Sequence, residues 1–175
     1  DQLEQTIKVL ADRRWDVAAI EKRFSDLAAS GIPPRSLSPA EFVRDKERIL
    51  WEIGERAAEY CYVTRSCAKG SALALLETFG LGSMTVIRAL SPFPGLSMSG
   101  GICGPVAGGL AAIGLFFSDP DPADSQRVDH YIAGRRFIER FEDAFGSLSC
   151  PDIQKRLLGR AYDPFAGAEE FAAYN

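Results

Sequence analysis

The stretch that decides the fold is residues 103–117, which read Cys-Gly-Pro-Val-Ala-Gly-Gly-Leu-Ala-Ala-Ile-Gly-Leu-Phe-Phe. It carries no charge and contains four glycines, which let neighbouring backbones approach closely. The whole region between Arg88 and Asp119 is also free of charge, so a membrane span has to be considered. Its continuous apolar part, residues 102–117, is shorter than the ~20 residues that a span needs. We therefore expect a buried Gly/Ala-rich central helix and no transmembrane span.

Helical patterns extend on both sides of this stretch. Apolar residues recur at three- and four-residue steps over residues 2–29, which predicts one or two helices there. Gly-Ile-Pro-Pro at 31–34 ends the pattern. Ser38-Pro39-Ala-Glu41 has the form of a capping box and predicts the start of the next helix, whose apolar face continues to Tyr60. Further helices are predicted over residues 66–79, 83–90, 103–117, 124–145 and 150–159, with a loop at 91–101. Strand-like alternation is absent, so the predicted fold class is all-α, a single-domain helical bundle.

The apolar face of the helix predicted over 124–145 can be read from the spacing of its large side chains. The residues expected on that face are Val128, Tyr131, Ile138, Phe141 and Phe145.

Composition narrows the function classes. A chain of 175 residues is long enough for one domain with a sizeable core. A net charge of −4 argues against nucleic acid as a partner. A single histidine excludes sites built on several histidines. No charged segment followed by an apolar one opens the chain, so we expect a cytoplasmic protein unless a leader precedes Asp1.

Charge is unevenly distributed along the chain. Residues 61–118 contain one acidic and three basic side chains, whereas residues 1–60 contain 12 acidic and 10 basic ones. The middle third is therefore expected to be the buried part, and three of the four cysteines lie in it.

Those four cysteines are Cys61, Cys67, Cys103 and Cys150. Three of them are predicted to lie at helix N-termini, where free backbone N–H groups and the helix dipole stabilise a thiolate and lower its pKa. The same donors would hydrogen-bond the sulfurs of a metal cluster. The ordinary alternative is four separate core cysteines, since free cysteine is among the most buried residue types.

The cysteine spacing matches no standard metal motif. There is no C-x-x-C, so the sequence supports neither a zinc ribbon nor a thioredoxin motif. Three uses of the four thiols stay open: an iron–sulfur cluster, a thiol–disulfide oxidoreductase, and a structural four-thiolate zinc site. No catalytic residue is predicted, and whether the chain is an enzyme is left open.

Cys61, then Ser66-Cys-Ala-Lys-Gly-Ser71, then Cys103 in a glycine-rich run, then Cys150, resembles the C-GCAxxG-C-C family of redox-active proteins. The resemblance covers about residues 40–160, with serines at 66 and 71 where the family has glycines. The family is related to the C-terminal part of split-Soret cytochromes. The expected organisation is an N-terminal helical extension (1–36), a four-cysteine helical redox domain (37–160) and a C-terminal tail (161–175).

The resemblance implies that Cys61, Cys67, Cys103 and Cys150 are the ligands of a 2Fe–2S cluster used in electron transfer or redox sensing. It also implies a redox partner protein and is compatible with a homodimer. Arg65 and Lys69 are expected to offset the charge of the site or to contact an acidic partner.

Two further polar residues stand out in the sequence. His130, the single histidine, is expected to be a surface residue of an amphipathic helix rather than part of a triad. Glu77, the one acid of the middle third, is expected to cap a helix or to pair with Arg88, and these two roles rank ahead of a third, assisting a bound substrate.

Overall fold

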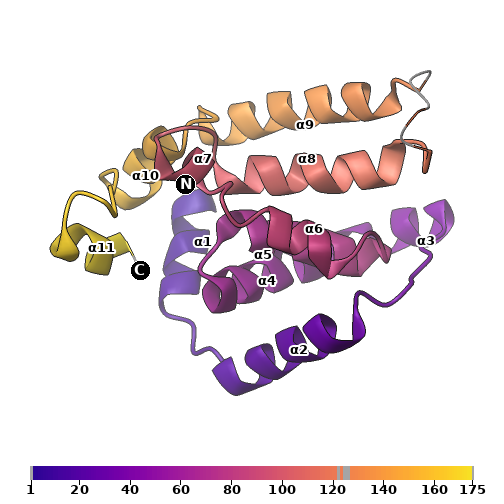
Figure 1. The fold of residues 1–175 in the computed structure, drawn as a ribbon, viewed down its shortest axis with the longest axis horizontal. Helices are drawn as coiled ribbons and strands as arrows, with labels where there is room; N and C mark the ends of the chain where they lie inside the picture. The colour runs from indigo at the N-terminus through magenta and orange to yellow at the C-terminus, as the bar shows by residue number, and fades with distance from the viewer. Residues whose placement is uncertain (1, 122, 124–126, 175) are drawn as a thin grey trace.

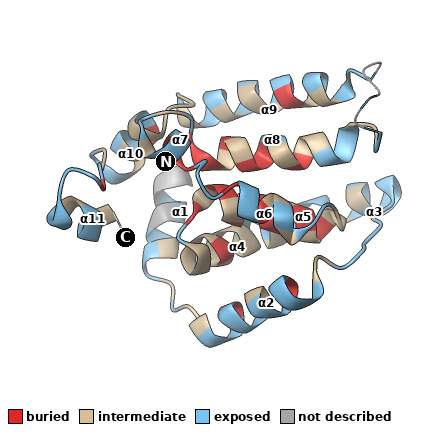
Figure 2. Cartoon of the chain, viewed as in Figure 1, coloured by how far each residue is buried: buried red, intermediate tan, exposed pale blue. Residues whose placement is uncertain are grey.

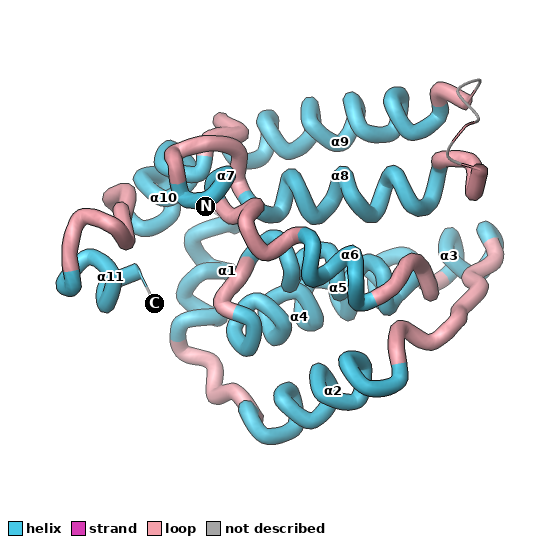
Figure 3. The backbone as a smooth tube through the Cα atoms, viewed as in Figure 1, coloured by secondary structure: helices cyan, strands magenta, loops and turns pink. Residues whose placement is uncertain are grey.

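The structure is a computed structural model, and it describes residues 2–121, 123 and 127–174. The described residues form eleven helices and no strand, which confirms the all-α prediction (Figure 3). In chain order the helices are α1 (Gln2–Ala11), α2 (Val17–Ser30), α3 (Pro39–Arg44), α4 (Lys46–Thr64), α5 (Cys67–Phe79), α6 (Met84–Ala89), α7 (Gly95–Met98), α8 (Gly104–Phe117), α9 (Asp129–Phe145), α10 (Cys150–Leu158) and α11 (Ala168–Tyr174).

The helices are arranged around α5. It packs against α4 on one side and α8 on the other, with α6 as a third neighbour, while α9 lies along α8 and α2 covers α4 (Figure 1). The Gly/Ala-rich helix α8 is buried along one side, but the helix with neighbours all round is α5 (Figure 2). Within the described residues, none of the helices combines the length and the apolar character that crossing a membrane would require.

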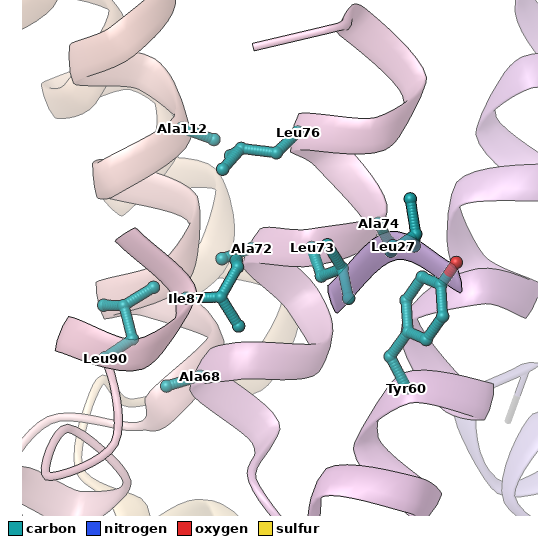
Figure 4. Packing of buried hydrophobic residues seen from close by; sticks show 10 residues of the cluster. All are labelled: Leu27, Tyr60, Ala68, Ala72, Leu73, Ala74, Leu76, Ile87, Leu90 and Ala112. Atoms are coloured by element: carbon teal, nitrogen blue, oxygen red, sulfur yellow. The ribbon is translucent and has the colours of Figure 1, made fainter. Parts of the chain in front are cut away.

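Two hydrophobic clusters hold the bundle together. The larger one is centred on α5, where Ala72, Leu73 and Leu76 are fully buried against side chains from four other helices (Figure 4). The smaller one joins α8, α9 and α10 through Val106, Ile153 and the phenylalanines of α9. The second cluster fixes the helix that begins at Cys150 against the helix that follows Cys103.

The contact between α5 and α8 is a backbone contact. A Cβ placed on Gly108 would lie 2.5 Å from the carbonyl oxygen of Ala68 and 3.1 Å from the backbone nitrogen of Ala72. No side chain larger than hydrogen fits there without moving a helix. The glycines of the sequence motif therefore act as expected, by letting two helices pack at minimum separation.

The contact between α4 and α5 includes a partly buried polar network. The fully buried Tyr60 donates its hydroxyl hydrogen to Glu77 Oε2 at 2.6 Å, and Arg56 Nη1 lies 3.1 Å from Glu77 Oε1. Burial, followed by the Glu77 carboxylate, raises the pKa of Tyr60. The predicted pairing of Glu77 with Arg88 is therefore wrong, because Glu77 faces α4 while Arg88 is exposed on α6.

Most predicted helix boundaries are confirmed. Ser38 and Glu41 form the capping box of α3, Ser66 caps α5, and Gly80 ends α5 in the left-handed conformation. The helix expected from residue 38 onward is split at Asp45 into α3 and α4. The predicted start at residue 124 lies outside the described residues, and the observed helix α9 begins at Asp129.

One face of α9 differs from the prediction. Val128 and Tyr131 are 54% and 72% exposed, so their predicted inward positions are wrong. The packed stripe passes instead through the buried Gly134 and its neighbours Phe137, Ile138, Phe141 and Phe145. By helical position Tyr131 lies on the same face, seven residues and about 20° from Ile138, but it belongs to the first turn of α9, before the packed stripe begins at Gly134.

The α5–α8 contact gives a stability prediction. Gly108→Ala is expected to lower the free energy of unfolding by about 1–3 kcal/mol, because the new methyl group must push two backbones apart. The matched control is Gly114→Ala in the same helix, where an added Cβ meets no atom within 4 Å. It should raise stability by up to about 1 kcal/mol, since alanine is the better helix former. Equilibrium urea unfolding measures both, and equal stability of the two variants would contradict the close contact.

Candidate four-cysteine site

Four segments bring the cysteines to the same end of the bundle. Cys61 lies in the last turn of α4, Cys67 is the first residue of α5, Cys103 caps α8 and Cys150 is the first residue of α10. The prediction that three cysteines lie at helix starts is confirmed. Each thiol is free and lies close enough to another to interact with it electrostatically.

Cys103 and Cys150 form one pair. A short antiparallel bridge joins the segments before them: the Cys103 N–H donates to the Leu148 carbonyl at 2.8 Å, and the Cys150 N–H donates to the Gly101 carbonyl at 2.9 Å. Two helix starts 47 residues apart are thereby held side by side. The Cys103 thiol donates a hydrogen bond to Cys150.

Cys61 and Cys67 form the second pair. The Cys61 Sγ lies 3.9 Å from the Cys67 carbonyl oxygen. Glycines make room for both sulfurs: a Cβ on Gly70 would lie 2.5 Å from Cys61 Sγ, and a Cβ on Gly104 would collide with Cys67 Sγ. Cys67 also interacts with both Cys103 and Cys150, so it links the two pairs.

The pKa values of Cys103 and Cys150 are shifted in opposite directions. The hydrogen bond from Cys103 lowers the pKa of Cys150 to about 7, although burial acts against this shift. The same hydrogen bond raises the pKa of Cys103, and burial and the neighbouring thiols raise it further. Cys150 is thus the thiol most easily ionised, with Cys103 as its proton-bearing neighbour.

The thiols of the second pair both have raised pKa values. Burial raises the pKa of Cys61 to about 12, with a further contribution from Cys67, while hydrogen bonds from Ser71 oppose the shift. Burial and Cys150 raise the pKa of Cys67 against N–H donors that include Gly104. The expectation that helix N-termini lower the thiol pKa is therefore wrong for Cys67 and Cys103, because burial and neighbouring sulfurs outweigh the backbone donors.

A strained turn borders the site beside Cys150. Three successive residues of α7, Leu96, Ser97 and Met98, have φ between 48° and 59°, which is left-handed backbone that costs about 1–2 kcal/mol per residue. A Cβ on Gly95 at the start of this turn would lie 3.5 Å from Cys150 Sγ. The sequence predicts only a loop here. Strained backbone of this kind tends to occur at functional sites.

The C-terminal segment covers the site, which the sequence does not predict. Residues expected to be a tail contain helix α11, and the half-buried Tyr174 lies near enough to interact with Cys67, Cys103 and Cys150. Burial and these three thiols raise the pKa of Tyr174. The aromatic residues at 162, 165, 171 and 174 were the available signal, since solvated tails contain few aromatics.

Three other residues singled out in the sequence are Arg65, Lys69 and His130. Arg65 lines a pocket with Cys61 and Cys67, and its guanidinium lies 4.8 Å from the centre of the Tyr62 ring. Lys69 does not line that pocket. His130 lies in the first turn of α9, at the opposite end of that helix from α10 (Figure 1), and packs on Tyr131 with ring centres 4.1 Å apart.

Comparison with known proteins identifies the domain. A family model described as "Putative redox-active protein (C_GCAxxG_C_C)" matches residues 65–171, more than half of the chain. The chain belongs to this family. The match includes Cys67, Cys103 and Cys150, while Cys61 lies just before it, and it extends into the C-terminal segment that covers the thiols. Comparison with curated proteins and with solved structures gives no match.

A redox role fits membership of the C_GCAxxG_C_C family. Within the described part of the chain, no three His, Cys, Asp or Glu side chains are gathered around one point as for a single metal ion. The cysteines are arranged instead as two adjoining pairs.

The opposite shifts of Cys103 and Cys150 give a pH prediction. In reduced, metal-free protein, alkylation of Cys150 by iodoacetamide should rise with a midpoint near pH 7, because the thiolate is the nucleophile and exists above the pKa. Cys103→Ala should move that midpoint to higher pH by removing the donor, whereas Cys61→Ala should leave it unchanged. Peptide mass spectrometry after timed labelling follows each cysteine separately. A wild-type midpoint at the ordinary thiol value of about 8.5 would contradict the pairing.

Proposed function

We propose that Cys61, Cys67, Cys103 and Cys150 bind a 2Fe–2S cluster and that the protein acts in electron transfer or redox sensing. The observation that carries this proposal is the arrangement of the four thiols as two adjoining pairs at one end of the bundle. A 2Fe–2S cluster has two irons, each held by two protein ligands. A single structural zinc would need all four thiolates around one point.

The chemistry of the donor set fits this cluster. Four free thiols are the ligands that such clusters take, and they come from four different helices. Gly70 and Gly104 leave space beside Cys61 and Cys67 that any side chain would fill. When bound, the cluster would supply a one-electron donor and acceptor.

The chain's own residues would set the properties of that centre. Backbone N–H groups of Ala68 and Gly104 point at the Cys67 sulfur, and the Ser71 N–H and hydroxyl point at Cys61. Hydrogen bonds of this kind to cluster sulfurs raise the reduction potential by stabilising negative charge. Tyr174 and the apolar packing around Val106 limit the access of water.

The Cys103–Cys150 pair favours a second candidate, a thiol–disulfide oxidoreductase. The Cys150 thiolate would attack a disulfide of a substrate, forming a mixed disulfide and releasing one substrate thiol. Cys103 would then lose its proton and attack the Cys150 sulfur, closing a Cys103–Cys150 disulfide and releasing the second thiol. The substrate disulfide gains two electrons and the protein dithiol loses them.

Metal analysis of protein purified without oxygen tests the first proposal. The expected result is a brown protein that absorbs in the visible range and contains iron and acid-labile sulfide in equal amounts. Replacing any one of the four cysteines by serine should remove most of the colour. Ser99→Ala is the matched control, because Ser99 lies in the loop beside Cys150 but offers no sulfur.

Two other results would overturn the cluster proposal. A colourless protein with one zinc per chain would indicate a structural site. A colourless, metal-free protein that gains two free thiols on reduction would favour the oxidoreductase, and Cys61→Ser should then retain that gain while Cys150→Ser loses it.

A further inference from the structure

The thiols open to the outside through two pockets. One of about 460 Å³ contains Cys61 and Cys67, and one of about 590 Å³ contains Cys150. Three residues line both pockets: Gln154, Tyr162 and Tyr174. Cys103 lines neither pocket and is only 9% exposed. The boundary between the two openings is therefore made mainly by residues 160–174.

Two contacts within this segment fix its shape, and one hydrogen bond joins it to α10. Arg160 Nη1 lies 2.5 Å from Glu170 Oε1, which ties the start of the segment to α11. The Arg160 guanidinium also lies 4.1 Å from the centre of the Tyr162 ring, and the Tyr162 N–H donates to Gln154 Oε1 at 2.9 Å. Pro164, between the two tyrosines, is buried.

The same segment is held less firmly than the bundle. Helix α11 has seven residues, none of them buried, and helices this short are not stable alone. Phe165, which precedes this helix, and Phe171, within it, are 78% and 58% exposed. The Arg160–Glu170 pair lies at the surface, where ion pairs contribute little to stability. Segments with so few buried contacts open at low free-energy cost.

We propose that residues 160–174 form a strap that selects by size the molecules that reach the four thiols, with Tyr162 and Tyr174 as the residues that narrow both openings. With the strap in place, small molecules enter the two pockets, and a folded redox partner reaches the sulfurs only after displacing the strap. The inference deepens the proposed function of the cysteines as redox groups. Its test uses reduced, metal-free protein, so failure of the cluster proposal does not affect it.

Thiol labelling with two reagents of different size tests the strap. Iodoacetamide is the small reagent, and a maleimide carrying a polyethylene glycol chain is the bulky one. In the wild-type protein, each of Cys61, Cys67 and Cys150 should react faster with iodoacetamide than with the bulky maleimide. Cys61 and Cys67 should react with iodoacetamide more slowly than Cys150, because their raised pKa values leave less thiolate, and Cys103 should be slowest with both reagents. Tyr174→Ala should raise the bulky reagent's rate at Cys67 and Cys150 about tenfold. Its effect on iodoacetamide should be less than about threefold.

Two conservative variants distinguish steric blocking by the strap from a general loss of folded structure. Tyr174→Phe keeps the ring and should retain the wild-type size preference. Glu170→Gln loosens the strap from a distance and should raise the bulky reagent's rate about two- to fivefold. Glu169→Gln is its matched control, because it removes the same charge from α11 and leaves the Arg160–Glu170 pair intact. Equal rates of the bulky reagent with wild type, Tyr174→Ala and Glu170→Gln would overturn the proposal.

Discussion

The backbone contact between α5 and α8 is the constraint on which the four-cysteine site depends. Gly108 lies against the carbonyl of Ala68, and one turn earlier Gly104 lies against the Cys67 sulfur. Because the two helices cannot be separated by side chains at these positions, their N-termini lie together, and each carries a cysteine at its start. The bridge between residues 102 and 149 then adds Cys150, and the turn from α4 into α5 adds Cys61.

This arrangement gives the four sulfurs different properties on one small surface. Cys150 is the ionisable thiol, Cys103 is its buried hydrogen-bond donor, Cys67 connects the pairs, and Cys61 is partly buried beside Gly70. A redox centre needs such control over charge and access, because an exposed thiolate would react with any oxidant. The C-terminal segment completes the enclosure, and its contacts with the bundle are few enough for it to open.

Much of the fold could be predicted from the sequence, because its signals are local. The capping box at Ser38, the Ser66 cap and Gly80 each act within a few residues, so helix ends followed from them. The pairing of Glu77 with Arg56 and Tyr60, the exposure of Tyr131 in the unpacked first turn of α9, and the cover formed by Tyr174 depend on helices distant in sequence. The thiol pKa values were predicted from helix ends alone, whereas burial and neighbouring sulfurs decide most of them.

Disulfide mapping after mild oxidation of the metal-free protein is the most direct test of whether the four sulfurs converge. Native protein treated with diamide, quenched with acid and digested should yield Cys103–Cys150 as the main crosslink, with any second bridge joining Cys61 to Cys67. Protein oxidised in urea should instead favour Cys61–Cys67, whose sulfurs are closest along the chain. Four thiols that stay free in the native protein, or the same crosslinks from native and unfolded chains, would contradict a shared site.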